Sequence, residues 1–176
     1  MDVLVGYATA HGSTREIACR LGGRLAKYGH TVDVRAMERV ERPDTYQVFV
    51  LGSAVHGMAW LPEAQDFVRR NHRLLGVRPV WLFSVGMPGA LRGPWKRLAD
   101  REAPVILKNL PQLPPFRGHR LLSGVIARDQ LSRGGRLRFR LMGCRYGDFR
   151  DWAAIEEWAD RIALDLAPCD SRPPGG

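Results

Sequence analysis

A short apolar strand that runs through a polar loop into a helix opens this chain, and it constrains the fold more than any other segment. Residues 3–7 are apolar or small, residues 9–14 read Thr-Ala-His-Gly-Ser-Thr, and a helical pattern begins at Ser13. A helix N-terminus presents unpaired backbone N–H groups and the positive end of the helix dipole. The three hydroxyl groups of the loop add donors, and Gly12 lets a ligand come close to the backbone. The segment therefore predicts a cradle for a phosphate monoester.

Apolar patterns alternate between strands and helices along the rest of the chain. We expect strands at 3–7, 31–35, 48–51, 80–85 and 121–127, and helices at 13–28, from Pro62, and after a cap at Asp151. Strands separated by helices form right-handed crossovers and a parallel sheet covered on both faces. The sequence predicts an α/β fold with a doubly wound five-stranded parallel sheet, in one domain over residues 1–168. Residues 169–176 are expected to form a disordered tail.

The first loop resembles that of the flavodoxin-like family, where it reads roughly Ser/Thr-x-Thr-Gly-x-Thr and binds the phosphate of FMN. Four positions fit this pattern: Thr9, Gly12, Ser13 and Thr14. Ala10 and His11 depart from it, since the family usually has threonine at both. A protonated His11 would offset the lost hydroxyl groups by pairing with the phosphate. The resemblance implies a flavodoxin-like sheet with the strand order 2-1-3-4-5 and an FMN cofactor held by residues 9–14.

The same resemblance implies that the loops after the third and fourth strands reach the isoalloxazine ring. Both loops are rich in small residues, so their backbone groups can approach a ligand. The expected site residues are Ser53, Ala54, Val55, His56, Gly57 and Trp60 in one loop and Ser84, Val85 and Gly86 in the other. Two interpretations of Trp60 stay open: its ring stacks on the flavin, or it packs before the helix at Pro62.

Arginine gives the chain a formal net charge of +9 and a sequence pI of about 10.3. Residues 117–150 contain nine arginines and two acidic residues. Within this stretch, Arg136, Arg138 and Arg140 alternate with Leu137, Phe139 and Leu141. Such a surplus indicates an anionic partner: a small-molecule substrate, a redox protein, or an anionic membrane surface contacted peripherally. No nucleic-acid reader module is recognisable, so nucleic acid is not expected.

The second half of the chain is similar to the branch of flavodoxin-like proteins that contains menaquinone-dependent protoporphyrinogen IX dehydrogenase. The resemblance rests on Gly-x-x-x-x-Gly after the third strand, an aromatic residue with a Pro-led helix, and the run Gly-Asp-Phe-Arg-Asp-Trp at 147–152. It implies a basic insertion before the last helix, which corresponds here to residues 131–150. It also implies an FMN-dependent oxidoreductase that passes electrons to an acceptor such as a quinone. The alternatives are a non-enzymatic electron-transfer protein and a module with a vestigial flavin site.

The sequence indicates no metal site, no paired carboxylates and no activated nucleophile, so no catalytic residue is assigned. A bound flavin would carry the chemistry, while the protein would bind and orient it. The three cysteines show no close pairing, which is typical of a reducing compartment. We therefore expect a cytoplasmic protein that contacts the inner face of the membrane at most peripherally.

Overall fold

A mostly parallel sheet has the predicted strand order. The computed structural model describes residues 1–86, 103–126 and 146–167. The parallel strands are β1 (Asp2–Ala8), β2 (Thr31–Ala36), β3 (Val48–His56), β5 (Val80–Gly86) and β6 (Gly118–Ser123), arranged as β2-β1-β3-β5-β6. In terms of the five parallel strands, this is the order 2-1-3-4-5, which confirms the predicted α/β fold. A short strand, β4 (Ala59–Trp60), pairs antiparallel with β3.

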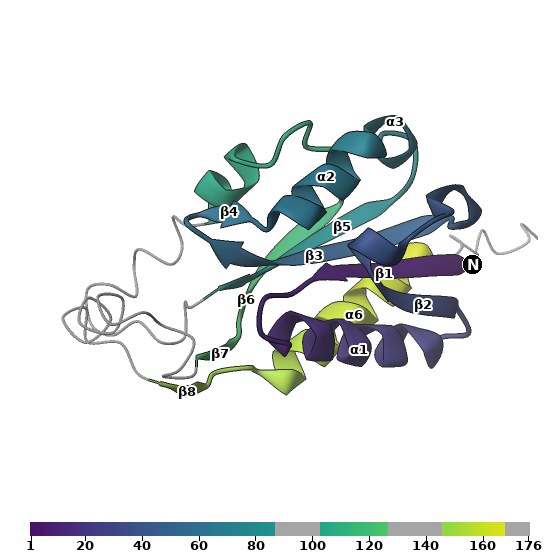
Figure 1. Cartoon of the computed structure of the whole chain (residues 1–176). Coiled ribbons are helices and arrows are strands. Elements are labelled where there is room, and N and C mark those ends of the chain that lie inside the picture. Colours follow the sequence, from purple (N-terminus) through teal and green to yellow (C-terminus); the bar gives the residue numbers. More distant parts are fainter. Residues whose placement is uncertain (87–102, 127–145, 168–176) are drawn as a thin grey trace, which may run out of the picture.

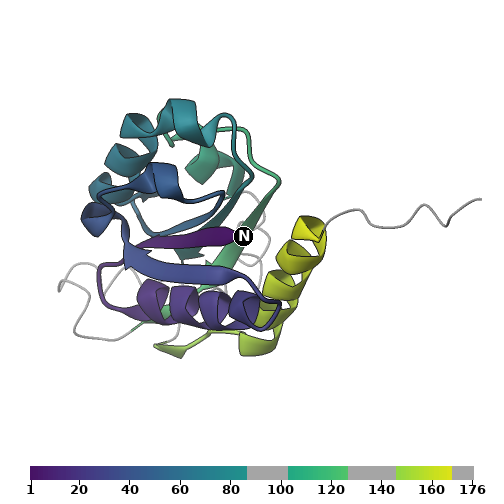
Figure 2. The same ribbon diagram turned by 90° about the vertical axis from the view of Figure 1, so that its right-hand side faces the viewer.

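Helices cover both faces of the sheet (Figures 1 and 2). On one face lie α1 (Ser13–Ala26) and α6 (Trp152–Leu166). On the other lie α2 (Pro62–Arg70), α3 (His72–Leu75) and the helical residues 103–108. Single 3-10 turns, η1 (Met37–Arg39) and η2 (Pro43–Thr45), connect β2 to β3. As predicted, Asp151 caps α6: its Oδ1 accepts the backbone N–H of Ala154 at 3.0 Å.

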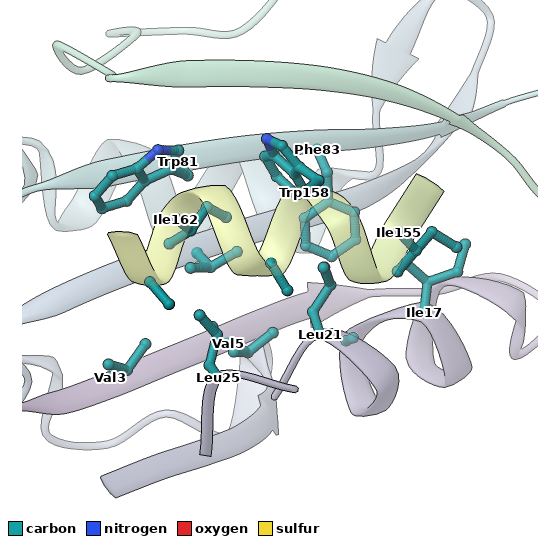
Figure 3. Packing of buried hydrophobic residues seen from close by; sticks show 14 of the residues in the cluster. Val3, Val5, Ile17, Leu21, Leu25, Trp81, Phe83, Ile155, Trp158 and Ile162 are labelled. Carbon is teal, nitrogen blue, oxygen red and sulfur yellow. The ribbon is translucent and has the colours of Figure 1, made fainter. Parts of the chain in front are cut away.

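Each face of the sheet buries its own apolar cluster. The cluster beneath α1 and α6 joins every fourth residue of α1 to the inward stripe of α6 (Figure 3). Its members include Val3, Val5, Ile17, Leu21, Leu25, Trp81, Phe83, Ile155, Trp158 and Ile162. Phe83 and Trp158 meet edge to face, with ring centroids 6.2 Å apart. The helical spacing of apolar residues therefore identified the correct buried faces.

The third and the last of the predicted strands differ most from the prediction. The third strand does not end at Leu51 but continues to His56 and folds back as a hairpin with β4. Gly57 and Met58 at its tip both have positive φ, as in the tight turns that suit strand twist. The last predicted strand begins earlier, at Gly118, and the chain then continues into β7 (Val125–Ile126), which pairs with β8 (Gly147–Asp148).

The predicted tail and residues 131–145 of the predicted insertion lie outside the described residues, so these expectations stay predictions. Within the described part of the chain, no helix has the length and apolar character that crossing a bilayer requires.

Candidate functional site at the carboxyl ends of the strands

The parallel register brings the three predicted loops to one edge of the sheet. Ala8 pairs with Ser53, Ser53 with Ser84, and Ser84 with Leu121. Ala8 is the last residue of β1, so the first loop leaves the sheet at this row, while β3, β5 and β6 continue two or three residues further. In a doubly wound sheet, a ligand binds beyond such a row, where neighbouring connections diverge to opposite faces.

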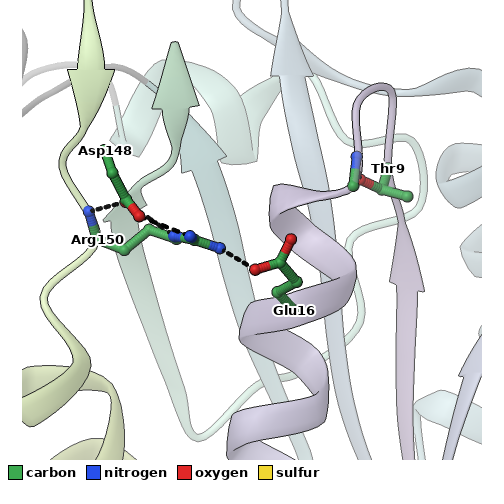
Figure 4. A network of polar contacts seen from close by, with 5 residues as sticks. Thr9, Glu16, Asp148 and Arg150 are labelled. Atoms are coloured by element: carbon green, nitrogen blue, oxygen red, sulfur yellow. Dashed lines mark hydrogen bonds and ion pairs between the residues drawn. The ribbon is translucent and has the colours of Figure 1, made fainter. Parts of the chain in front are cut away.

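The first loop turns sharply at Gly12 and enters α1 without a capping side chain. Gly12 has φ +93°, and its backbone N–H donates to Thr9 Oγ1 at 2.9 Å (Figure 4). Its carbonyl oxygen accepts the N–H of Glu16, which starts the helix. Because no side chain caps this end of α1, its first N–H groups remain available to an anion.

Thr14 supplies the clearest sign of a missing partner. Its side chain is fully buried in the first turn of α1, and its Oγ1 has no hydrogen-bond partner among the described residues. A buried hydroxyl group without a partner costs about 1–3 kcal/mol. An oxygen-rich ligand in the loop would supply that partner, so the orphaned atom fits the phosphate that the sequence predicted.

Gly124, which the sequence did not single out, closes the site beside Ser13. Its N–H donates to the carbonyl oxygen of Gly86 at 3.0 Å. A Cβ at Gly124 would lie 2.9 Å from Val85 Cγ1 and 3.1 Å from Ser13 Oγ. The segment between β6 and β7 therefore packs against both the first loop and the end of β5, and only glycine fits there without displacing a neighbour.

The predicted residues of the second and third loops divide into exposed and buried groups. His56 and Gly57 are exposed at the hairpin tip, and Ala54 and Val55 are partly buried. Ser53, Ser84, Val85 and Trp60 are buried, while Gly86 is partly buried. The Ser53 hydroxyl accepts the Leu61 N–H and donates to the Ala54 carbonyl. The side chains of the two serines are thus engaged inside the protein, and their backbone groups remain the candidates for ligand contact.

Trp60 presents no open face for a flavin in this structure. Its side chain is 2% exposed and packs in the cluster under α2 with Ala64 and Phe67. Its indole N–H donates to Ser84 Oγ at 2.8 Å. This packing agrees with the second of the two interpretations left open by the sequence, and contact of Trp60 with a flavin stays a prediction.

In the first loop, Ala10 and His11 are exposed, while Thr9, Gly12 and Ser13 are partly buried. The exposed His11 side chain therefore lies next to the cradle. Thr9 also lines a small hollow of about 70 Å³, together with Glu38 of η1 and Glu63 of α2. The sequence did not indicate these two acidic residues as neighbours of the first loop, because they lie in elements far from it along the chain.

A larger hollow of about 640 Å³ runs along α1 and α6. It begins at Gly12 and is lined by helix residues such as Arg15, Cys19 and Trp152. Gly12 is the only predicted site residue among its lining residues, so this hollow is separate from the space between the three loops.

Comparison with known proteins identifies the family of this arrangement. The family described as Flavodoxin domain matches residues 4–145, which is most of the chain and includes all three loops. The chain belongs to this family. Its members are flavin-binding redox proteins, which agrees with the cradle at the N-terminus of α1.

A relative with an assigned activity is protoporphyrinogen IX dehydrogenase [quinone] of Escherichia coli strain K12. It is 31% identical over 99 residues, which cover 55% of this chain and 54% of that protein. The same identity and coverage hold for the protein of that name from Escherichia coli O157:H7. The chain thus spans about half the length of the curated relatives it matches.

Solved structures with the same fold include a flavodoxin from the domain Archaea, with a TM-score of 0.59 and 12% identity over 96% of this chain and all of that one. A Streptococcus pneumonia TIGR4 flavodoxin has a TM-score of 0.55 and 15% identity over 94% of this chain and 100% of that one. Rubredoxin oxygen:oxidoreductase from Desulfovibrio gigas has a TM-score of 0.60 at 14% identity, covering 94% of this chain and 36% of that one. At such identities the likeness shows the fold.

Proposed function

We propose that this chain binds FMN in the cradle of residues 9–14 and acts as an oxidoreductase. In this proposal, electrons pass from a reduced substrate through the flavin to an acceptor such as a quinone. The observation that carries the proposal is the buried Thr14 hydroxyl group, which has no hydrogen-bond partner among the described residues, in the uncapped first turn of α1. A phosphate is the group that such a turn binds best, because it accepts several N–H and O–H donors at once.

The described residues fit the phosphate and the ring of FMN. The first turn of α1, with Ser13 and Thr14, would hold the phosphate, while Thr9 shapes the loop by accepting the Gly12 N–H. Backbone groups of the hairpin and of the end of β5 would meet the polar edge of the ring. When bound, the flavin supplies two-electron transfer chemistry, and the protein supplies orientation and electrostatics.

The proposed electron donor is an anionic small molecule or an anionic redox partner. Support comes from the basic stretch 117–150 and from the name of the Escherichia coli relative, whose substrate is a porphyrinogen. Within this stretch, Arg117 lies over the ring of Trp81, and Arg150 is paired with acids of this chain. The partner would therefore be recruited by other arginines, of which we propose Arg136, Arg138, Arg140 and Arg145. These four positions lie outside the described residues.

The experiment is a comparison of FMN with riboflavin, followed by a turnover measurement. Purified protein is titrated with each flavin, and we expect at least about tenfold tighter binding of FMN, because each charge-assisted bond to phosphate contributes roughly 1.5–3 kcal/mol. Equal affinities would remove the phosphate cradle from the proposal.

The FMN-loaded protein is then reduced, and its reoxidation by a soluble naphthoquinone is followed by absorbance. Rapid reoxidation supports the oxidoreductase. Reoxidation by a redox protein but not by the quinone would indicate the electron-transfer alternative. Failure to bind any flavin would indicate a vestigial site.

A further inference from the structure

Three side chains from three strands form a hydrogen-bonded chain below the hairpin of β3 and β4. The indole N–H of Trp60 on β4 donates to Ser84 Oγ on β5 at 2.8 Å. The same Oγ lies 2.9 Å from Nε2 of His119 on β6. Trp60 and Ser84 are buried and His119 is partly buried, so little water is available to replace these bonds.

The direction of each bond follows from the burial of Ser84. Its oxygen already accepts the Trp60 N–H, so its own proton needs an acceptor. His119 Nε2 is the acceptor within reach among the described partners of this hydroxyl. Burial lowers the pKa of His119 to about 4, so the imidazole is neutral near pH 7. We assign the tautomer with the proton on Nδ1, in which Nε2 accepts the Ser84 hydroxyl proton. With this assignment the chain runs from Trp60 through Ser84 to His119.

This chain of bonds acts on the hairpin by which β3 continues beyond the end of β1. Trp60 pairs with Val55, so a bond to its indole fixes the strand that carries the tip back to the sheet. At the base, the Leu61 N–H donates to Ser53 Oγ at 3.0 Å. At the tip, Asn109 Nδ2 donates to the Met58 carbonyl oxygen at 3.0 Å. The hairpin is thus held at its base, its middle and its tip.

The tip needs this support because its backbone conformation is energetically unfavourable. Met58 has φ +63°, a conformation that costs a residue with a side chain roughly 1–2 kcal/mol. A hairpin with such a tip and only two residues in β4 would be marginal on its own. Of these three contacts, the bond from Trp60 to Ser84 is the one that depends on side chains from two other strands, β5 and β6.

We propose that His119 is a positioning residue for the flavin site: by orienting the Ser84 hydroxyl group to receive the Trp60 indole, it holds the hairpin 55–60 in the place where it forms one wall of the ring site. The proposal rests on the proposed binding of FMN. It gives Trp60 the function of an anchor below the site, and it extends the site to a strand, β6, that supplies none of the residues predicted from the sequence.

The test is a double-mutant cycle with two readouts. Trp60→Phe removes the indole N–H, Ser84→Ala removes the hydroxyl group, and the double variant removes both. The first readout is amide hydrogen exchange of residues 55–60 in the FMN-free protein. The second is the dissociation constant of FMN. Each single variant should speed exchange in the hairpin and weaken FMN about 3- to 10-fold, which is the usual net worth of one hydrogen bond.

The double variant should resemble the single ones, because both substitutions break the same bond. His119→Phe should have the same effects, and His119→Gln, which keeps an acceptor, should restore much of the wild-type behaviour. Trp158→Phe is the matched control. It trims a buried indole in the cluster on the opposite face, so it should leave hairpin exchange and FMN affinity unchanged.

Unchanged hairpin exchange and FMN affinity in Trp60→Phe and Ser84→Ala would overturn the proposal. So would effects of the two substitutions that simply add, or a failure of His119→Gln to restore either readout. Wild-type protein that binds no FMN would instead overturn the proposed function. In that case, hairpin exchange in the FMN-free variants still decides whether the three side chains position the hairpin.

Discussion

Arg150 Nη1 lies 2.6 Å from Glu16 Oε2, which ties the segment before the last helix to the first turn of α1 across 134 residues of sequence (Figure 4). The same guanidinium contacts Asp148 at 2.6 Å and lies over the ring of Trp152, 4.6 Å from its centroid. Its side chain is only 10% exposed. This arginine therefore fastens β8 and α6 to the helix that begins the candidate site.

Arg150→Met should lower the free energy of unfolding by about 1–3 kcal/mol, because charged hydrogen bonds to two carboxylates are lost from a mostly buried position. Urea denaturation measures the change. Arg161→Met is the control, since its ion pair with Glu157 is exposed on one helix and such pairs contribute little. Similar small changes in both variants would show that the Arg150 contacts do not stabilise the fold.

Thr14→Val should act in opposite directions on stability and on binding. Valine has nearly the shape of threonine but lacks the hydroxyl group, which is buried without a partner in the described structure. The FMN-free protein should therefore keep or gain stability. Binding of FMN should weaken about tenfold or more, because a bond to the phosphate is lost, while binding of riboflavin should not change.

Thr31→Val serves as the control for Thr14→Val, since Thr31 is exposed at the start of β2, at the other end of the sheet. It should leave the affinities for both flavins unchanged. A loss of riboflavin affinity in Thr14→Val equal to the loss for FMN would mean that Thr14 supports the loop and does not contact phosphate.

Gly124→Ala should disturb the site, whereas Gly23→Ala should stabilise the protein. A Cβ at Gly124 meets Val85 and Ser13 within about 3 Å, so we expect a loss of roughly 1–3 kcal/mol and weaker binding of FMN. A Cβ at Gly23, within α1, meets no atom within 4 Å and should add about 0.5–1 kcal/mol through the unfolded state. Thermal or urea unfolding separates the two results, and equal effects would contradict the packing at Gly124.

The parts of the fold that the sequence predicted are those encoded locally. The cradle at 9–14 was recognisable because strand, loop and helix start lie next to each other. The alternation of apolar patterns predicted a parallel sheet, and the Asp151 cap followed from a single residue type at a helix start. Each of these features depends on residues only a few positions apart, whereas the strand order came from the resemblance to the flavodoxin-like family.

The parts that the sequence missed depend on contacts between distant residues. The third strand was ended too early because Gly-Ser-Ala interrupts its apolar run, and the turn at Gly57 lacks the usual Asn-Gly signal. His119 meets Ser84 from 35 positions away, and no pattern in either segment indicates the pairing. Arg150 was counted with the recruiting charges, although its partners make it part of the structure.

His119 should make stability depend on pH between about 6.5 and 4. Burial lowers its pKa from 6.5 to about 4 in the folded protein, so within this range the unfolded chain binds a proton that the folded protein does not. Stability is therefore lost as the pH falls from 6.5 towards 4. His119→Gln cannot bind this proton, so its stability should fall less over the same range.

Urea denaturation of both proteins at several pH values tests this prediction through the difference between the two curves. His30, whose pKa burial also lowers, is present in both and cancels. Parallel curves from pH 7 to 4 would mean that His119 titrates normally in the folded protein.

The basic insertion should affect partner recruitment and leave the cofactor in place. We expect a variant with Arg136, Arg138, Arg140 and Arg145 changed to Gln to keep its FMN content, because the candidate cradle is built from residues 9–14. Exposed cations attract anions through fields that salt screens over about 8 Å at physiological ionic strength. Turnover with an acidic tetrapyrrole, or binding to anionic liposomes, should therefore fall and become less sensitive to salt.

Arg69→Gln and Arg73→Gln, at exposed positions in and after α2, control for the loss of positive charge. Loss of FMN from the fourfold variant would assign the insertion to the cofactor site, and unchanged turnover and liposome binding would show that its charge recruits neither partner.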